Sequence, residues 1–365
     1  MRIYGLNVGT EHASILDRES STLYRTKKES TTLFVHLCKS SCNHRDGIPR
    51  GAVSCIFGAP VVYGGKLNAI PLALTVTSVF LHAGWNLLGK KQSPSLAFFV
   101  FAVGSGGLLF SPVLFWGLPN LWYLPITFWL LLIVSGFFQL IYLGGLAWAY
   151  SNGDMSVLYP FVRGLPVALV AVVANAALGG STLHPGVFIG IVLVVAGTFV
   201  LPLNNVRSLR LATYLTPAFG FALLAVAGTV GYSIADKAAL DLMRQHGFNA
   251  LTAGLTYTVI QAYAIVIWAI LPLRYIARER RAVETIWATQ RQNAVLAGVA
   301  MTLTYGLVLI AMATGADVRQ IVALRQLSIP VGTLFGILLL KERVSGPKLF
   351  GTAIMLCGLA QIALM

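Results

Sequence analysis

Charged residues are scarce in this chain, and acidic residues are the scarcest of them. Asp, Glu, Lys and Arg make up 10% of the 365 residues, against 57% hydrophobic residues and a mean hydropathy of +0.77. A soluble globular domain carries about 25% charged residues, so the composition excludes that class. The net charge of +14 comes mostly from short loops between apolar segments. Such cations set membrane topology and contact anionic lipid headgroups, so we expect no nucleic-acid partner.

Cysteine and histidine are few, and their placement predicts neither a disulfide framework nor a metal centre. The chain has 4 Cys and 6 His. One group of them lies close together: His36, Cys38, Cys42 and His44. Its spacing matches no common structural zinc pattern, so we expect no metal and no cofactor.

Carboxylates are missing from the predicted centres of the apolar segments. An enzyme embedded in the membrane would need paired carboxylates, metal ligands or a nucleophile beside a base, so we expect no enzymatic activity. Proton coupling through a central carboxylate is disfavoured for the same reason. His82 within the first segment, solute exchange and facilitated passage remain open as alternatives.

What the chain does contain is long apolar segments, ten of them from residue 69 onward. Each is near the ~20 residues that a helix needs to cross the hydrocarbon core. Unbroken apolar runs exclude the alternating pattern of barrel strands, so the sequence predicts an all-α integral membrane protein with ten transmembrane helices. The segments cover approximately 69–88, 96–117, 125–149, 155–178, 185–203, 212–236, 249–273, 293–313, 317–340 and 346–364.

The two halves of the chain repeat one another. Stretches 136–165 and 298–327 align without a gap at an offset of 162. Matching residues are Gly136, Gly144, Ala149, Gly153, Arg163 and Leu165 in the first stretch and Gly298, Gly306, Ala311, Gly315, Arg325 and Leu327 in the second. An odd number of spans per copy inverts the second copy in the membrane. We therefore predict two inverted five-helix repeats, 69–203 and 212–364, joined by a connector at 204–211.

Further features recur between the two halves or lie at defined positions in their helices. They are Trp85, Asn86 and Lys90 at the end of the first helix, Tyr232, Ser233 and Lys237 at the end of the sixth, Gly190 and Gly197 against Gly351 and Gly358, Pro166 and Pro330 in the fourth and ninth helices, and Leu340-Lys341-Glu342-Arg343 before a Gly-rich last helix. With these features residues 69–364 resemble the EamA-type branch of the drug/metabolite transporter superfamily.

The resemblance implies a transporter, for example for efflux, that moves a small organic solute by alternating access through a central cavity between the two repeats. It does not name the solute. A flippase for a lipid-linked sugar or a phospholipid is the alternative. We expect a small-molecule substrate and lipid contacts, a monomer or homodimer, and the bacterial inner (plasma) membrane as the location.

Two arginines are the sharpest indication of chemistry. Arg163 and Arg325 lie about three residues from the centres of the fourth and ninth helices, roughly 5 Å at 1.5 Å per residue. A guanidinium at that depth costs at least ~2.5 to 3.5 kcal/mol, so each should face a wet cavity or acceptors. The nearest acids, Asp154 and Asp317, lie at helix starts. The pair predicts an anionic ligand in the cavity, because Arg binds carboxylate and phosphate through two parallel hydrogen bonds. The alternative is that both arginines donate to backbone carbonyls at the breaks made by Pro166 and Pro330.

Five other residues are candidates for substrate contact. Trp85, Asn86, Tyr232 and Ser233 occupy equivalent repeat positions and could line the same cavity. Hydrogen bonds between helices for Asn86 and Ser233, and interfacial anchoring for Trp85, are the structural alternatives. Tyr159 precedes Arg163 by four residues and therefore shares its helix face.

Residues 1–68 and the orientation of the chain are left open by the sequence. The extension is either a tail outside the natural protein, with a true start at a non-Met codon near Val61 or Val62, or a disordered native tail, or a transit peptide. Connections after the odd-numbered helices hold twelve cations, and those after the even-numbered helices hold three. The positive-inside rule would place both termini outside, whereas the cations before the first helix favour the opposite.

Overall fold

The computed structural model describes residues 69–92, 94–177, 185–203, 214–313, 321 and 324–364, all within one compact unit. Residues 1–68, the connector 204–211 and Asp317 lie outside this part of the chain, and so do His36, Cys38, Cys42 and His44, for which we predicted no metal. The regular structure of the described residues is helical, which confirms the predicted all-α class. The helices are α2 (Ala69–Lys91), α3 (Leu96–Leu109), η1 (Ser111–Val113), α4 (Leu114–Leu121), α5 (Ile126–Asn152), α6 (Met155–Ala177), α7 (Pro185–Val200), α8 (Pro217–Gln245), α9 (Ala250–Tyr275), α10 (Ala277–Thr285), the π-helical turn η4 (Ile286–Gln290), α11 (Arg291–Ala313), α13 (Ser328–Leu339) and α14 (Gly346–Leu364).

Six helical stretches in the described residues are long and apolar enough to cross a membrane. They are α2, α5, most of α6, α8, α9 and the continuous stretch from α10 to α11. A seventh is formed if α3 and the following helical turns, which bend by 47°, make one span. With 16 and 12 residues, α7 and α13 are shorter than a full crossing needs. The protein is therefore a multi-span membrane protein, and the count of ten spans stays a prediction.

Local chemistry explains where several helices begin. The Ser95 side chain accepts a hydrogen bond from the backbone N–H of Phe98 at the start of α3. Asn249 does the same for Thr252 at the start of α9, over 2.8 Å. Both are N-caps, which satisfy a backbone donor that the helix itself leaves free.

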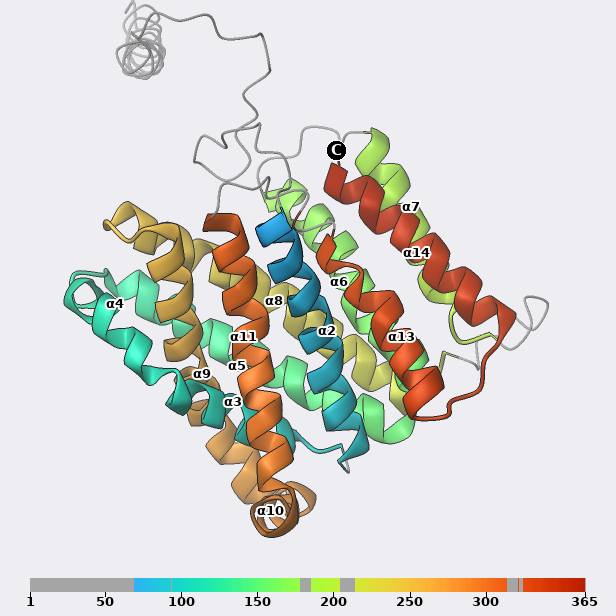
Figure 1. Ribbon diagram of the computed structural model, residues 1–365, viewed down its shortest axis with the longest axis horizontal. Helices are drawn as coiled ribbons and strands as arrows, with labels where there is room; N and C mark the ends of the chain where they lie inside the picture. Colours follow the sequence, from blue (N-terminus) through green and yellow to red (C-terminus); the bar gives the residue numbers. More distant parts are fainter. Residues whose placement is uncertain are drawn as a thin grey trace, which may run out of the picture. The chain divides into compact units, whose positions relative to one another are not determined.

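The helices associate in a few extensive pairs (Figure 1). The largest interfaces join α5 to α8, α7 to α14, and α2 to α11. Smaller ones join α3 to α9 and α11, α5 to α9, α6 to α8, and α13 to α6 and α2. In Figure 1, α7 and α14 run side by side at one edge of this unit.

Glycines allow the closest of these approaches. A methyl group at Gly190 of α7 would lie 2.8 Å from the carbonyl oxygen of Gly358 in α14. One at Gly298 of α11 would lie only 2.0 Å from the carbonyl oxygen of Ala102 in α3. Backbones in contact at this distance leave no room for a side chain, as is common where helices pack in lipid.

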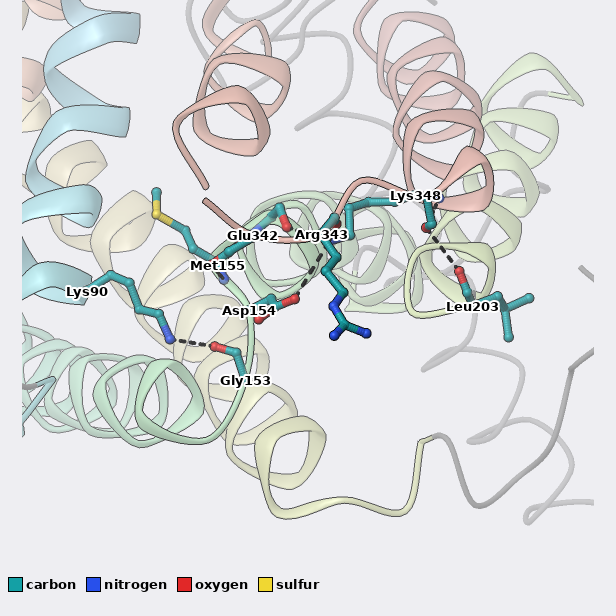
Figure 2. Close-up of polar contacts among 10 residues, drawn as sticks. Lys90, Gly153, Asp154, Met155, Leu203, Glu342, Arg343 and Lys348 are labelled. Atoms are coloured by element: carbon teal, nitrogen blue, oxygen red, sulfur yellow. Dashed lines mark hydrogen bonds and ion pairs between the residues drawn. The ribbon is translucent and has the colours of Figure 1, made fainter. Parts of the chain in front are cut away.

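Five connections meet at one end of the helices, which we call the Lys90 end. The Lys90 ammonium group donates to the carbonyl oxygens of Tyr150 and Gly153, over 2.5 and 2.7 Å. Four other side chains join the remaining connections. Glu342 accepts from the N–H groups of Met155 and Ser156, and Glu279 accepts from the N–H group of Ala97. Ser345 donates to the carbonyl of Leu203, and Arg278 donates to the carbonyl of Pro94. Figure 2 shows Lys90 and Glu342 on either side of the start of α6.

Candidate functional site

An internal cavity of about 580 Å³ lies between α2, α5, α6, α8, α9, α11 and the residues that precede α13. Five of the seven residues predicted to contact substrate line it: Arg163, Arg325, Trp85, Tyr232 and Ser233. The volume falls in the range of about 300 to 1,000 Å³ that is typical of small-molecule sites. Helices distant in sequence thus bring both arginines to one cavity.

The two arginines reach the cavity from different elements. Arg163 belongs to α6, and Arg325 is helical and lies three residues before the start of α13. Arg163 donates from Nη2 to the Ser328 hydroxyl over a long 3.4 Å, and its Nε has no acceptor. Within the described residues, neither guanidinium forms an ion pair or donates to a backbone carbonyl. The alternative interpretation, in which backbone carbonyls hold both arginines, therefore finds no such contact.

Other buried polar atoms near the arginines also lack partners. In the described part of the chain, His82 Nε2 and Gln326 Oε1 are buried without a hydrogen bond, as is Arg163 Nε. The His82 ring packs edge-on against Trp85, with 5.1 Å between the ring centroids. A buried unsatisfied polar group costs about 1 to 3 kcal/mol, so three of them around one cavity indicate a place where a polar ligand group is accommodated.

Trp85, Tyr232 and Ser233 line the cavity in different ways. Trp85 is 3% exposed and packs edge-on against Phe99, with 6.0 Å between the ring centroids. Tyr232 packs against Tyr142 with 5.8 Å between centroids. The Ser233 hydroxyl donates to the carbonyl of Thr229 in its own helix, over 2.6 Å.

Asn86 and Tyr159 lie behind the wall and do not line the cavity. Asn86 is 1% exposed; its amide donates to the His82 carbonyl and accepts from the Tyr150 hydroxyl, both over 2.9 Å. Tyr159 is 1% exposed and packs its ring on Gly332, where a methyl group would lie 2.4 Å away. Asn86 therefore makes a hydrogen bond between helices, to Tyr150, which was its structural alternative, and Tyr159 supports the wall beside Arg163.

One carboxylate in the cavity wall was not anticipated. The sequence placed the end of the sixth helix at residue 236, but α8 continues to Gln245, so Asp236 lies nine residues inside it. We predicted no carboxylate at the centres of the apolar segments; Asp236 lies away from the midpoint of its helix, yet it lines the cavity. The signal was present: Ala238 to Met243 favours a helix, and the chain turns only at Gly247, whose φ is +87°.

Asp236 is held by neutral donors from two neighbouring helices. Its Oδ1 atom accepts from the Tyr257 hydroxyl and from Gln261 Nε2, each over 2.8 Å, and from the Ser135 hydroxyl. Gln261 also donates to Ser135 over 2.8 Å. Three donors hold the carboxyl group in place through Oδ1.

The lysines that close the repeated helices have different surroundings. Lys90 caps the C-terminal end of α5 and lies outside the cavity lining, whereas Lys237 lines the cavity. Lys237 pairs with Asp241 one turn further along α8 and not with its neighbour Asp236, as the helix geometry predicts. Asp154 lies just before α6, where an acidic side chain can accept from the free N–H groups of the first turn. The side chain that satisfies those N–H groups is instead that of Glu342, while Asp154 lies 3.7 Å from the Lys348 ammonium group (Figure 2).

No protein-family model and no curated protein matches this chain. A solved structure described as "Crystal structure of protein" is similar to it, with a TM-score of 0.48 and 20% identity over 82% of this chain and 99% of that one. A neighbour at this distance indicates no function. Fold and site together define a multi-span helical membrane protein with a charged internal cavity.

Proposed function

We propose that the protein is a transporter of the EamA type that moves a small organic solute, bearing an acidic group, by alternating access. The acidic group binds to Arg163 and Arg325. The observation that carries the proposal is the presence of both arginines, without carboxylate partners among the described residues, in one cavity inside a membrane protein.

The proposed inverted repeat is supported by pairs of contacts that are related by the offset between the repeats. When both residues of one contact are moved to their equivalent positions in the other repeat, they form the second contact. Gly136 of α5 packs on Ala264 of α9, and Gly298 of α11 packs on Ala102 of α3. Both members shift by 162 residues, because 136 + 162 = 298 and 102 + 162 = 264. Contacts that map onto one another in this crossed way are what a pseudo-two-fold axis between two repeats produces.

The interface between α7 and α14 has the same property. Gly190 approaches the carbonyl oxygen of Gly358, and Gly351 approaches that of Gly197, each with 2.8 Å to a methyl group placed there. The offset is 161 in both cases, since 190 + 161 = 351 and 197 + 161 = 358. The fifth and tenth helices of the proposed repeats thus pack through equivalent surfaces.

The larger helix pairs follow the same rule. Pairing the third helix with the sixth, α5 with α8, is equivalent to pairing the eighth with the first, α11 with α2. These are two of the three largest interfaces. The third interface joins α7 to α14, the fifth helix to the tenth. Exchanging the two repeats leaves this pair unchanged.

Solute chemistry follows from the charges. Two guanidinium groups in a low-dielectric interior favour an anion, and carboxylate or phosphate matches their donor geometry. Aromatic walls from Trp85 and Tyr232 add apolar contact area for the remainder of the solute.

Alternating access requires an end that opens, and the Lys90 end is closed by packed side chains. Phe98, Phe99, Tyr150 and Met155 are fully buried there beside Trp85. The bonds from Lys90 to Gly153 and from Glu342 to Met155 join helix ends across this core. In the proposed cycle they break when the cavity opens toward this end.

The proposal is tested by thermal shift of the purified protein against organic anions, neutral amphiphiles and cations. We expect organic anions to raise the melting temperature of the parent and to lose this effect in Arg163→Gln and in Arg325→Gln. Arg280→Gln is the matched control, because Arg280 is exposed on α10, away from the cavity. Stabilisation by neutral compounds, unchanged in both cavity variants, would contradict the anion site.

Transport itself is tested in proteoliposomes. We expect uptake of the stabilising anion to saturate with its free concentration. Movement of lipid-linked cargo only, with no uptake of free solute, would favour a flippase instead.

A further inference from the structure

Asp236 has no counter-ion in the cavity wall. All three of its hydrogen bonds come from neutral groups and go to Oδ1, and Oδ2 has no partner in the described residues. The adjacent ammonium group, that of Lys237, pairs with Asp241. Asp236 lines the same cavity as the arginines. A carboxyl group therefore faces the cavity with one oxygen available.

The carboxyl group and the arginines line the cavity together with aromatic side chains, Tyr232 and Tyr305 among them. Tyr232 lies within electrostatic reach of both Asp236 and Arg163, and Tyr305 within reach of both Asp236 and Arg325. Neither arginine is among the groups that act on Asp236 itself. The arginines and the carboxyl group are thus distinct polar sites in the lining of one cavity.

We propose that the solute is dipolar, with an acidic group bound by Arg163 and Arg325 and a cationic group, such as an ammonium, bound by Asp236. This inference rests on the proposed function and specifies the substrate class of the same cavity. The Asp236 Oδ2 atom accepts from the ammonium, while Ser135, Tyr257 and Gln261 hold the carboxylate in place through Oδ1.

The spacing of the two sites restricts which dipolar solutes fit. Asp236 lies on α8, whereas Arg163 lies on α6 and Arg325 precedes α13, and neither arginine acts electrostatically on Asp236. In an α-amino acid the nitrogen and the carboxyl carbon are two bonds apart, about 2.5 Å. We expect such a molecule to be too short to engage both sites at once. A solute whose charges are separated by several bonds, as in an ω-amino acid or a short peptide, can do so.

A set of small compounds isolates this requirement in the unmodified protein. The dipolar probe is 6-aminohexanoate, whose charged ends lie roughly 7 Å apart when extended. Hexanoate lacks the ammonium, hexylamine lacks the acid, and norleucine is an isomer of the probe with adjacent charges. We expect 6-aminohexanoate to stabilise the protein at about tenfold lower concentration than hexanoate or norleucine, because it alone engages both sites.

Asp236→Asn tests the carboxylate directly. Asparagine keeps an Oδ1 acceptor for the three neutral donors and removes the charge. We expect this variant to bind 6-aminohexanoate and hexanoate equally well, with hexanoate unchanged from the parent. Asp154→Asn is the matched control, because Asp154 lies at the Lys90 end outside the cavity lining. It should keep the preference for the dipolar probe.

Different results overturn the two proposals. Equal stabilisation of the parent by hexanoate and 6-aminohexanoate, lost in Arg163→Gln, would overturn the dipolar solute and leave the anion transporter standing. Norleucine matching 6-aminohexanoate would overturn the separated sites. No stabilisation by 6-aminohexanoate at millimolar concentration would also overturn the inference. If every acidic compound stabilised both arginine variants as well as the parent, the proposed function itself would be overturned.

Discussion

The Lys90 ammonium group donates to the carbonyl oxygen of Gly153 over 2.7 Å, and thereby ties the end of α2 to the end of α5 (Figure 2). Together with its bond to the Tyr150 carbonyl, this contact satisfies acceptors that the last turn of α5 leaves free. A cation at this position also interacts favourably with the negative end of the helix dipole.

Removing this ammonium group should weaken the Lys90 end. We expect Lys90→Met, which keeps the length of the side chain, to lower the stability by about 1 to 3 kcal/mol, because two carbonyl oxygens lose a charged donor. Thermal unfolding in detergent measures the effect. Lys91→Met is the control, since Lys91 is exposed and has no side-chain contact among the described residues. Equal melting temperatures of the two variants would contradict a structural role of Lys90.

The same end depends on Glu342, which accepts from the N–H groups of Met155 and Ser156, both over 2.7 Å. A carboxylate at a helix N-terminus is stabilised by the free N–H groups and by the helix dipole. We expect Glu342→Ala to cost about 1 to 3 kcal/mol and Glu342→Gln to cost less, because glutamine retains one acceptor. Unfolding of both variants in parallel gives the order. A larger loss in the glutamine variant would exclude the capping role.

The sequence predicted much of the fold because the requirement of a bilayer is local. A segment must be apolar along its whole length to cross lipid, so helix positions can be read from hydropathy alone. Each predicted segment in the described residues contains a helix. The arginines at 163 and 325 were found for the same reason, since a charge within an apolar run stands out.

The rest of the site depends on features that hydropathy does not carry. Asp236 was missed because α8 continues as a helix beyond its apolar part, and polar residues facing an internal cavity resemble the start of a loop. Asn86 and Trp85 are neighbours in sequence, yet only Trp85 lines the cavity, because adjacent positions on a helix point in different directions. Which of them faces inward is decided by how α2 packs on α11 and α13.

Sidedness can now be tested at a defined surface. Contacts join the connections that follow α2, α5, α7, α9 and α13 at the Lys90 end, and these connections carry most of the loop cations. The positive-inside rule places this end in the cytoplasm. In a cysteine-free background, we expect Arg281→Cys to be protected from an impermeant thiol reagent in intact cells. Tyr123→Cys, between α4 and α5, should be labelled.

Permeabilised cells provide the control for these labelling experiments, since both positions are exposed and should then react. Labelling of Arg281→Cys and protection of Tyr123→Cys in intact cells would reverse the assignment. It would favour the orientation in which the first helix begins in the cytoplasm.

The crossed glycine contacts predict which glycines cannot be replaced. In Gly298→Ala, the added methyl group would meet the Ala102 carbonyl oxygen at 2.0 Å, so α3 and α11 must separate. Overpacking of this kind costs about 1 to 3 kcal/mol or more, and we expect a reduced melting temperature and loss of solute binding.

Gly136→Ala, at the equivalent position against Ala264, should act in the same direction with a smaller effect, because its contact at 2.8 Å is with a side-chain methyl group. Gly220→Ala is the matched control: nothing lies within 4 Å of a methyl group there, and alanine favours the helix. If Gly298→Ala melts at the same temperature as Gly220→Ala, the close approach of α3 and α11 is wrong, and with it the crossed contact that supports the repeat.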